Sequence, residues 1–445
     1  MSEKPRQRWL VIAHAFNMDG RAASQTITDK LPHLRREGVD VVVLSGVSGR
    51  LDSEYEHHQL WPLGPAGFRF ELRHVLGLIL GKGIRYRLLM LLASLFLLPW
   101  MVLEKVLWPL ESSWSWWLSA YLKGQSLDKE KPFDLIYSSG GAFAAHLAAH
   151  ALKKVTGTPW LAEVHDPLVM PGQLPISRQQ KMQAKVERLI CTDADIAVWF
   201  TDQALASAHL RNPQLGDRGK VLLPGIDKPF LTPPPYQQGE RFLVGHFGSL
   251  SSTRHLGPII EALKILSTKR PDLIQATELH VFGGPLDDIS SRMIDESEIR
   301  NSVRHFGRIE ADMKTGLSGR QQILHRMRSV DVLLLLHGHD DICAEYIPSK
   351  LYEYLWMQRP ILAVVHRNVQ MANLIAGQGH TVVCTNGSAS VSADLGTGLA
   401  CKLEKLFDRW SSEGLADNGQ ESPFTTMVAV TQLLAWVDEL PALTK

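Results

Sequence analysis

Two glutamates, Glu345 and Glu353, stand eight positions apart in the sequence. Between them, Pro348 and Ser349 predict that a helix begins, with a proline in its first turn and a serine cap nearby. A helix start presents unpaired N–H groups and the positive end of the helix dipole, which suits phosphate, and Lys350 adds a positive charge. Glu353 could accept hydrogen bonds from a ribose diol, and Glu345 could face the group attached to the phosphates. The spacing alone is also compatible with an ordinary amphipathic helix.

The sequence around these glutamates resembles the E-x7-E region of family 4 glycosyltransferases, which are retaining enzymes of the GT-B fold. The resemblance rests on residues 348–355, which read PSKLYEYL, and on residues 359–363, which read RPILA. This variant is similar to the branch that builds bacterial surface polysaccharides. It implies a transferase that moves a sugar from a nucleoside diphosphate donor to an acceptor hydroxyl.

A second candidate donor-binding segment contains Gly248, Ser249 and Arg254 in a loop expected between a strand and a helix. A cation at Arg254 could pair with the donor diphosphate and stabilise the leaving group. The family usually carries Gly-Arg-Leu with a lysine five positions after the arginine, and this chain has Ser249 and Arg254 at those positions. One expected cation is therefore missing, and Lys350 is the candidate replacement. The alternative for Arg254 is a solvated loop residue.

Candidate acceptor-side residues follow strands of the first half. His165 and Asp166 resemble the family segment in which His or Arg precedes Asp at the cleft, where the histidine could bond a sugar hydroxyl. The alternative is a buried histidine bonded to backbone. Asn17, Gly20 and Arg21 lie in the loop after the first expected strand, where many family members have two glycines that contact the acceptor or the phosphates.

The resemblance implies roles for these residues. Glu345, His165 and Asp166 are the expected catalytic residues, whereas Gly248, Ser249, Arg254, Ser349, Lys350 and Glu353 are expected to bind the donor. GT-B enzymes usually need no divalent ion, so neither a catalytic metal nor another cofactor is expected. No residue suggests itself as a nucleophile on the sugar, which favours front-face substitution over double displacement.

Short apolar runs alternate with helical patterns along the chain, which is typical of parallel sheets wrapped by helices. The expected strands are residues 9–15, 39–44, 134–137, 160–164, 196–200, 221–223, 242–248, 279–282, 303–306, 330–336, 361–365 and 382–384. We therefore predict an α/β fold of two doubly wound, Rossmann-like domains that face each other across a cleft. Ligands should bind at the carboxyl ends of the strands.

The chain of 445 residues is long enough for two domains. The predicted boundaries are an acceptor domain at residues 1–225, a donor domain at 226–422, and a final helix at 423–445 that crosses back to the first domain. Proline- and glycine-rich segments near residues 224–235 mark the change from one half to the other.

An insertion at residues 68–124 interrupts the alternating pattern. Residues 88–103 form a run of sixteen uncharged, mostly apolar residues that contains Pro99, with basic residues before it and tryptophans near its end. The run is short for a membrane span, and both of its ends must return to one sheet. We therefore expect residues 85–117 to form an in-plane or re-entrant helical hairpin at the membrane surface. Packing against its own domain and a dimer contact are the alternatives.

Net charge, cysteine content and the N-terminal residues exclude several classes of protein. The net charge of +1 gives no electrostatic case for nucleic acid, and the four cysteines form no metal-binding pattern. The apolar run at 9–13 is too short for a signal peptide. We expect a cytoplasmic enzyme, peripheral or monotopic at the inner face of the cytoplasmic membrane, that uses a nucleotide sugar and a glycan or polyprenyl-linked acceptor.

Two other functions remain compatible with the sequence. A sugar-nucleotide epimerase of the same fold would convert the donor without an acceptor. A non-catalytic scaffold protein would also fit the missing cation at Ser249, although Glu345, Glu353 and Arg254 argue against it.

Overall fold

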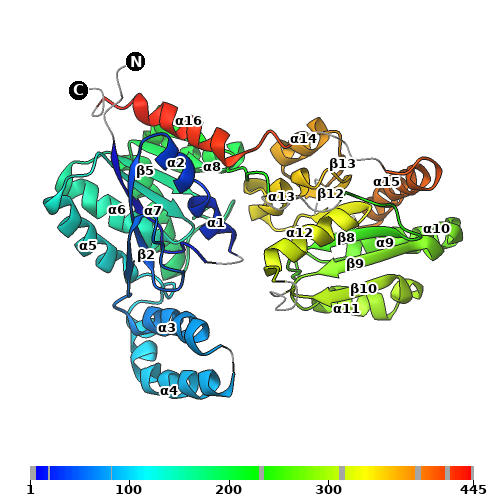
Figure 1. The fold of residues 1–445 in the computed structure, drawn as a ribbon, viewed down its shortest axis with the longest axis horizontal. Coiled ribbons are helices and arrows are strands. Elements are labelled where there is room, and N and C mark those ends of the chain that lie inside the picture. The colour runs from blue at the N-terminus through cyan, green and yellow to red at the C-terminus, as the bar shows by residue number, and fades with distance from the viewer. Residues whose placement is uncertain are drawn as a thin grey trace. The chain divides into compact units, whose positions relative to one another are not determined.

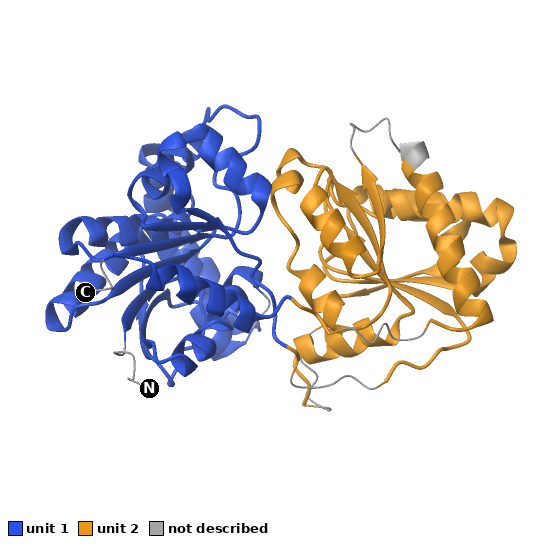
Figure 2. Ribbon diagram, turned by 90° about the horizontal axis from the view of Figure 1, so that it is seen from above, with its two compact units in different colours: residues 1–227, 424–445 blue, residues 228–423 orange. Residues whose placement is uncertain are grey.

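The computed structural model describes residues 7–18, 21–81, 83–229, 235–309, 316–385, 392–415 and 421–441. The chain divides into two compact units, which Figure 2 shows in different colours. Unit 1 comprises Met1–Asp227 together with Phe424–Lys445, and unit 2 comprises Lys228–Pro423.

Unit 1 contains a parallel sheet of seven strands in the order β3-β2-β1-β4-β5-β6-β7. Its strands are β1 Arg8–Ile12, β2 Asp40–Gly46, β3 Glu56–Leu60, β4 Leu135–Gly140, β5 Trp160–Val164, β6 Ile196–Trp199 and β7 Gly219–Val221. Its helices are α1 Ala22–Thr28, α2 Leu31–Arg36, α3 Pro65–Leu80, α4 Ile84–Leu107, α5 Trp116–Glu130, α6 Phe143–Thr156, α7 Arg178–Asp193, α8 Asp202–Arg211 and α16 Thr426–Asp438, with a 3-10 turn at Pro213–Arg218.

Helices cover both faces of this sheet because its central strands are apolar on both sides. One core contains Trp116 from α5 and Trp160 from β5. The opposite core contains Trp9 from β1 and Leu433 from the C-terminal helix α16, which lies beside α2 in Figure 1.

Unit 2 contains a parallel sheet of six strands in the order β10-β9-β8-β11-β12-β13. Its strands are β8 Phe242–Phe247, β9 Thr277–Phe282, β10 Val303–Gly307, β11 Val332–Leu336, β12 Ile361–His366 and β13 Thr381–Thr385. Its helices are α9 Gly257–Lys269, α10 Pro271–Ala276, α11 Asp288–Asp295, α12 Gly319–Ser329, α13 Lys350–Trp356, α14 Val369–Gly377 and α15 Ser392–Ser412, with 3-10 turns at Glu298–Ser302 and Asp341–Glu345.

The prediction of two Rossmann-like α/β domains is confirmed. In each sheet the strand order reverses beside the first strand of the unit, between β1 and β4 and between β8 and β11. Such a reversal leaves a crevice at the carboxyl ends of the strands, which is where ligands bind in open α/β sheets.

The insertion forms a pair of helices, α3 and α4. The bounds expected for a helical hairpin, residues 85–117, are therefore wrong, because these residues contain only one helix of the pair, α4, and its partner α3 lies before them. The pair projects from the rest of unit 1 in Figure 1. Pro99 does not end the apolar helix, which continues for 24 residues from Ile84 to Leu107. This is the one helix in the described part of the chain that is long and apolar enough to cross a membrane. Only 6% of its most apolar stretch of 18 residues is buried within the protein.

Gly49 tests the packing at the carboxyl edge of the first sheet. A Cβ atom at this position would lie 1.8 Å from the carbonyl oxygen of Phe16, which is part of the backbone and cannot rotate away. We expect Gly49→Ala to lower the free energy of unfolding of unit 1 by about 1–3 kcal/mol. Urea unfolding measures this difference.

Gly377→Ala is the matched control, because no atom lies within 4 Å of the Cβ that it would add on α14. Equal stability of the two variants would contradict the steric argument.

Candidate active site

The segment with the two glutamates lies at the carboxyl edge of the second sheet. Glu345 ends the 3-10 turn that follows β11, and Glu353 lies in the first turn of α13. Both carboxylates are buried, with 2% and 5% of the residue exposed. Ser349 is the residue before α13, but its side chain makes no capping hydrogen bond. The predicted serine cap is therefore wrong, because Ser349 already has the helical backbone angles φ −56° and ψ −26°.

Two cations hold the carboxylate of Glu353. Lys350 Nζ lies 2.5 Å from one oxygen, and Arg320 Nε lies 3.7 Å from the other. Arg320 comes from α12, and nothing in the sequence pattern connected it with Glu353. Lys350, the candidate for the missing cation, thus already has a carboxylate partner in this structure.

Arg254 lies in the loop between β8 and α9, which begins with Gly248 and Ser249. Its Nη2 donates a hydrogen bond of 2.6 Å to the hydroxyl of Tyr346, the residue after Glu345. Its Nε is buried and has no hydrogen-bond partner within the described residues. The structure therefore brings Arg254 next to the glutamate segment.

Two buried histidines border the same loop. Burial, and to a lesser extent the charge of Arg254, lowers the pKa of His246 to about 4 and that of His337 to about 3. The backbone N–H of His366 donates to Nδ1 of His337 at 3.3 Å, so neutral His337 carries its proton on Nε2. Neither Nε2 atom has a partner within the described part of the chain. Both rings can therefore form a hydrogen bond with a ligand in the neutral form.

In unit 1, His165 belongs to a buried polar network at the ends of β4 and β5. Its Nε2 lies 2.9 Å from a carboxylate oxygen of Glu163 and 2.9 Å from the hydroxyl of Ser139. The other oxygen of Glu163 accepts from Lys30 and, at 2.8 Å, from the hydroxyl of Tyr137. Burial alone would raise the pKa of Glu163, but Lys30 and His165 hold it well below its usual range.

This network fixes the orientation of His165. A carboxylate only accepts hydrogen bonds, so Nε2 carries the proton and Nδ1 is left for another partner. Nδ1 is buried and has no partner within the described residues. His165 therefore bonds to side chains, and the alternative of a histidine bonded to backbone is wrong. Asp166 is exposed.

The loop after β1 is described in part. Asn17 has a positive φ of 50°, and its side-chain amide donates to Asp52 at 2.9 Å. Gly20 lies outside the described residues. Arg21 is exposed, and its guanidinium carbon lies 5.7 Å from the centre of the Phe70 ring on α3.

The helix pair is attached at this same edge of the first sheet. His14 follows β1, and its Nε2 lies 3.0 Å from the fully buried carboxylate of Glu71 on α3. Beside α3 and α4 is a groove of about 530 Å³. It is lined mainly by leucine and tryptophan side chains, with Trp100, Trp108 and Trp117 among them.

Glu104 is the acidic residue in this groove, and its carboxylate is fully engaged. It accepts hydrogen bonds from the indole of Trp114 at 2.6 Å and from the backbone N–H of Ala66 at 2.7 Å. The groove therefore suits an apolar occupant.

Nothing in the described residues resembles a metal centre, because no three His, Cys, Asp or Glu side chains come close enough to share an ion. The donor-side and acceptor-side candidates lie in separate units.

Comparison with known proteins identifies the fold family. Residues 22–224 match the family described as a glycosyl transferase 4-like domain. Unit 1 therefore contains a glycosyl transferase 4-like domain, and the chain has the GT-B fold. No curated protein sequence matches it.

Solved structures of low sequence identity share the fold of this chain. The lipopolysaccharide outer core galactosyltransferase WaaB is 12% identical, with a TM-score of 0.54, 97% of this chain covered and 99% of WaaB. WaaG, a glycosyltransferase involved in lipopolysaccharide biosynthesis, is 14% identical, with a TM-score of 0.54 and the same coverage of 97% and 99%. An α,α-trehalose 6-phosphate synthase from Burkholderia multivorans is 12% identical, with a TM-score of 0.56 and coverage of 99% and 100%. The chain spans 58% of the length of TarM.

The two low pKa values predict how the stability of unit 2 depends on pH. Because His246 and His337 are uncharged when folded, the unfolded chain binds more protons below its histidine pKa of about 6.5. Stability should be highest above that pH and should fall as the pH drops toward 4. Each histidine contributes at most about 1.4 kcal/mol per pH unit.

Urea unfolding at several pH values between about 5 and 7 measures this slope. The variant His246→Asn/His337→Asn should show a flatter dependence than the wild type. His305→Asn, at an exposed position on β10, should keep the original slope. An unchanged slope in the double variant would contradict the assignment of neutral rings.

Proposed function

We propose that this enzyme transfers a sugar, with retention of anomeric configuration, from a nucleoside diphosphate to a lipid-linked acceptor in bacterial surface polysaccharide synthesis. It would act at the inner face of the cytoplasmic membrane without a metal ion or other cofactor. The observation that supports this proposal most is the contact between His14 and Glu71, which attaches the apolar helix pair at the acceptor-side edge of the first sheet.

The acceptor side combines polar and apolar features on one edge. His165, Asn17 and Arg21 follow strands of the sheet, and α3 begins shortly after the end of β3. The exposed apolar surface of α4 and the groove beside it are suited to lipid. A lipid-linked acceptor would therefore present its sugar near these loops while its chain remains in the bilayer.

The donor side supports nucleoside diphosphate binding in unit 2. In our assignment, Glu353 binds the ribose and Glu345 orients the donor sugar. Arg254 and Lys350 neutralise the diphosphate, and Gly248, Ser249 and Ser349 line its loops. His165 and Asp166 of unit 1 contact the sugar or the acceptor hydroxyl.

The reaction that fits these roles is front-face substitution. The bond between the anomeric carbon and the diphosphate oxygen breaks, and the bond to the acceptor oxygen forms on the same face. The acceptor proton passes to the departing diphosphate, whose charge Arg254 would stabilise. This route needs no carboxylate nucleophile on the sugar.

WaaB and WaaG, which share the fold, are described as acting in lipopolysaccharide synthesis, and the proposed pathway is of that kind. The second candidate, a sugar-nucleotide epimerase, would convert the donor without an acceptor and gives no role to the exposed helix α4. A scaffold protein would bind no donor at all.

Donor binding can be tested by thermal shift with UDP, GDP, ADP, CMP and their common sugar conjugates. At a ligand concentration a hundredfold above Kd, one nucleotide class should stabilise the protein by about 2.7 kcal/mol. Glu353→Gln should greatly reduce this shift, because it replaces one of the two acceptor oxygens proposed to bind the ribose diol with an NH2 donor.

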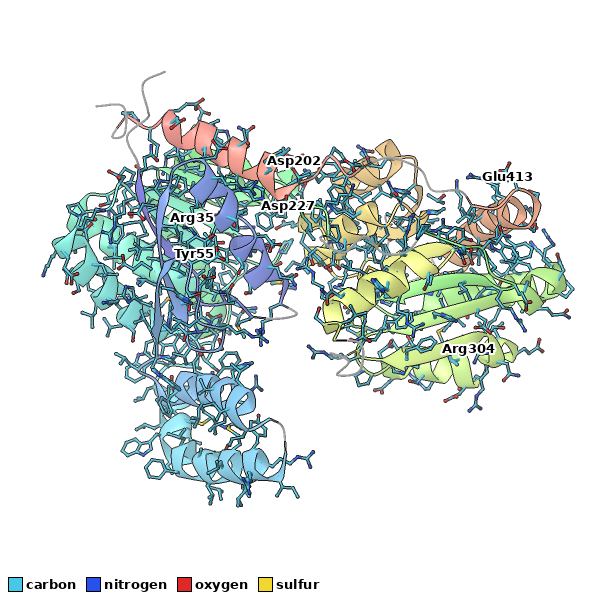
Figure 3. All side chains as sticks on the ribbon, viewed as in Figure 1. Arg35, Tyr55, Asp202, Asp227, Arg304 and Glu413 are labelled. Atoms are coloured by element: carbon cyan, nitrogen blue, oxygen red, sulfur yellow. The ribbon has the colours of Figure 1, made fainter. Side chains whose placement is uncertain are left out.

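Glu413→Gln, after the end of α15 (Figure 3), is the matched control and should keep the shift. A folded wild-type protein that no nucleotide stabilises would favour the scaffold alternative.

Membrane binding can be tested with the triple variant Leu91→Gln/Leu95→Gln/Phe96→Gln, whose residues are 56%, 59% and 76% exposed on α4. Because these side chains have little contact within the chain, their loss should weaken binding to phospholipid vesicles by about tenfold or more without unfolding the protein. Vesicle cosedimentation measures the change.

The control variant is Leu174→Gln/Ile176→Gln/Leu210→Gln, at residues that are 84%, 81% and 82% exposed outside the helix pair. Equal binding of the two variants would contradict a membrane role for α4. If the wild type forms a dimer in solution and the triple variant on α4 does not, the result would support a dimer contact through α4 instead.

A further inference from the structure

Four basic side chains surround the ring of Phe70 at the base of α3. The guanidinium carbons of Arg21 and Arg73 lie 5.7 and 5.2 Å from the ring centre. The imidazole centres of His74 and His14 lie 4.8 and 6.4 Å from it. Phe70 thus brings an arginine of the acceptor-side loop next to an arginine of the inserted helix.

The two arginines have no carboxylate partner in the described part of the chain, although both are exposed. Arg73 Nη2 contacts only Nε2 of His74, at 3.4 Å. Burial and then the charges of Arg73 and Arg21 lower the pKa of His74, so this ring is neutral and can accept from Arg73. The facing carboxylate is Glu71, which is fully buried beside His14.

The two guanidinium carbons lie 5.7 and 5.2 Å from the same ring centre, so they form a local concentration of positive charge. Binding an anion there is favourable because it offsets this charge. Guanidinium groups bind phosphate through paired N–H donors, which makes phosphate or diphosphate the best matched ligand. Flanking an aromatic ring also limits the freedom of both side chains, so less entropy is lost on binding.

The position of this pair indicates which phosphate it binds. Arg73 lies on α3, which packs against the apolar helix α4, and Arg21 lies in the loop after β1. If α4 rests in the bilayer, the pair lies between the apolar surface and the acceptor-side loops. A lipid phosphate group occupies that position between its chain and its sugar.

We propose that Arg21 and Arg73, which both lie beside Phe70, bind the phosphate or diphosphate of the lipid that carries the acceptor sugar. The proposal rests on the proposed function, since it assumes a lipid-linked acceptor. It assigns the two arginines to recognition of the lipid head group, whereas Arg254 and Lys350 serve the donor in unit 2.

The test compares three proteins: the wild type, Arg21→Gln/Arg73→Gln, and Arg85→Gln/Arg87→Gln. The last variant loses the same charge from exposed positions at the start of α4 and is the matched control. Each protein is titrated with geranyl diphosphate, which is soluble in water, and with geraniol. We expect diphosphate binding by the wild type and the control, and binding about tenfold weaker for each arginine removed.

A second measurement uses neutral phosphatidylcholine vesicles, alone or with a polyprenyl phosphate or phosphatidylglycerol added. Preference for polyprenyl phosphate over phosphatidylglycerol, lost only in Arg21→Gln/Arg73→Gln, supports the proposal. Equal losses in both variants, or equal binding to both anionic lipids, would show general attraction to negative membranes and overturn it.

The two titrations separate this inference from the proposed function. The protein could bind neutral vesicles but neither bind geranyl diphosphate nor bind vesicles more tightly when polyprenyl phosphate is added. This result overturns the arginine site and leaves the proposed membrane enzyme unaffected. Geranyl diphosphate binding that depends on Arg21 and Arg73, in a protein that binds no vesicle, supports the site and overturns the membrane location.

Discussion

A parallel sheet returns the chain to the same edge after every crossover, and this constraint organises both units. The loops at the carboxyl ends of the strands collect residues that are distant in sequence. His14, His165 and the start of the inserted helix pair meet one edge in unit 1. Arg254, His337 and Glu353 meet the corresponding edge in unit 2. The fold thus supplies the positions, and the loops supply the chemistry.

Buried carboxylates hold these loops in place. Glu163 orients His165, and Glu104 accepts a hydrogen bond from the backbone at the start of α3. Glu353 forms ion pairs with Lys350 and Arg320. A buried charge is costly unless cations or N–H groups surround it. Each of these carboxylates therefore constrains several partners at once. Loops held in this way lose little freedom when a ligand arrives.

The sequence predicted the fold because most strands are apolar and buried on both faces. It missed β3, whose residues Glu56–Leu60 are mostly polar because this strand lies at the edge of the sheet. The strand predicted at 221–223 begins two residues after the observed β7, Gly219–Val221. The apolar run continues beyond the last residue that pairs with β6. Alternation of apolar residues is a weak signal at an edge, where one side of the strand meets solvent.

Spacing alone could connect candidate site residues only where they are close in sequence, and Arg254 and His165 were added by the family resemblance. The spacing of Glu345 and Glu353 was visible, but Arg320 is on another helix and Lys30 is 133 positions from Glu163. Such pairs exist only through the tertiary fold. The predicted serine cap at Ser349 failed because the backbone there is already helical, which residue type alone does not determine.

The C-terminal helix has a consequence for how this protein is made. Unit 2 interrupts unit 1 in the sequence, since Phe424–Lys445 returns to the first unit. Ala429, Val430, Leu433 and Val437 of α16 complete a core that begins with Trp9 and Val11. During synthesis, the ribosome must therefore finish the second domain before the first can close its core. Until then, nascent unit 1 exposes an apolar face that a chaperone would recognise.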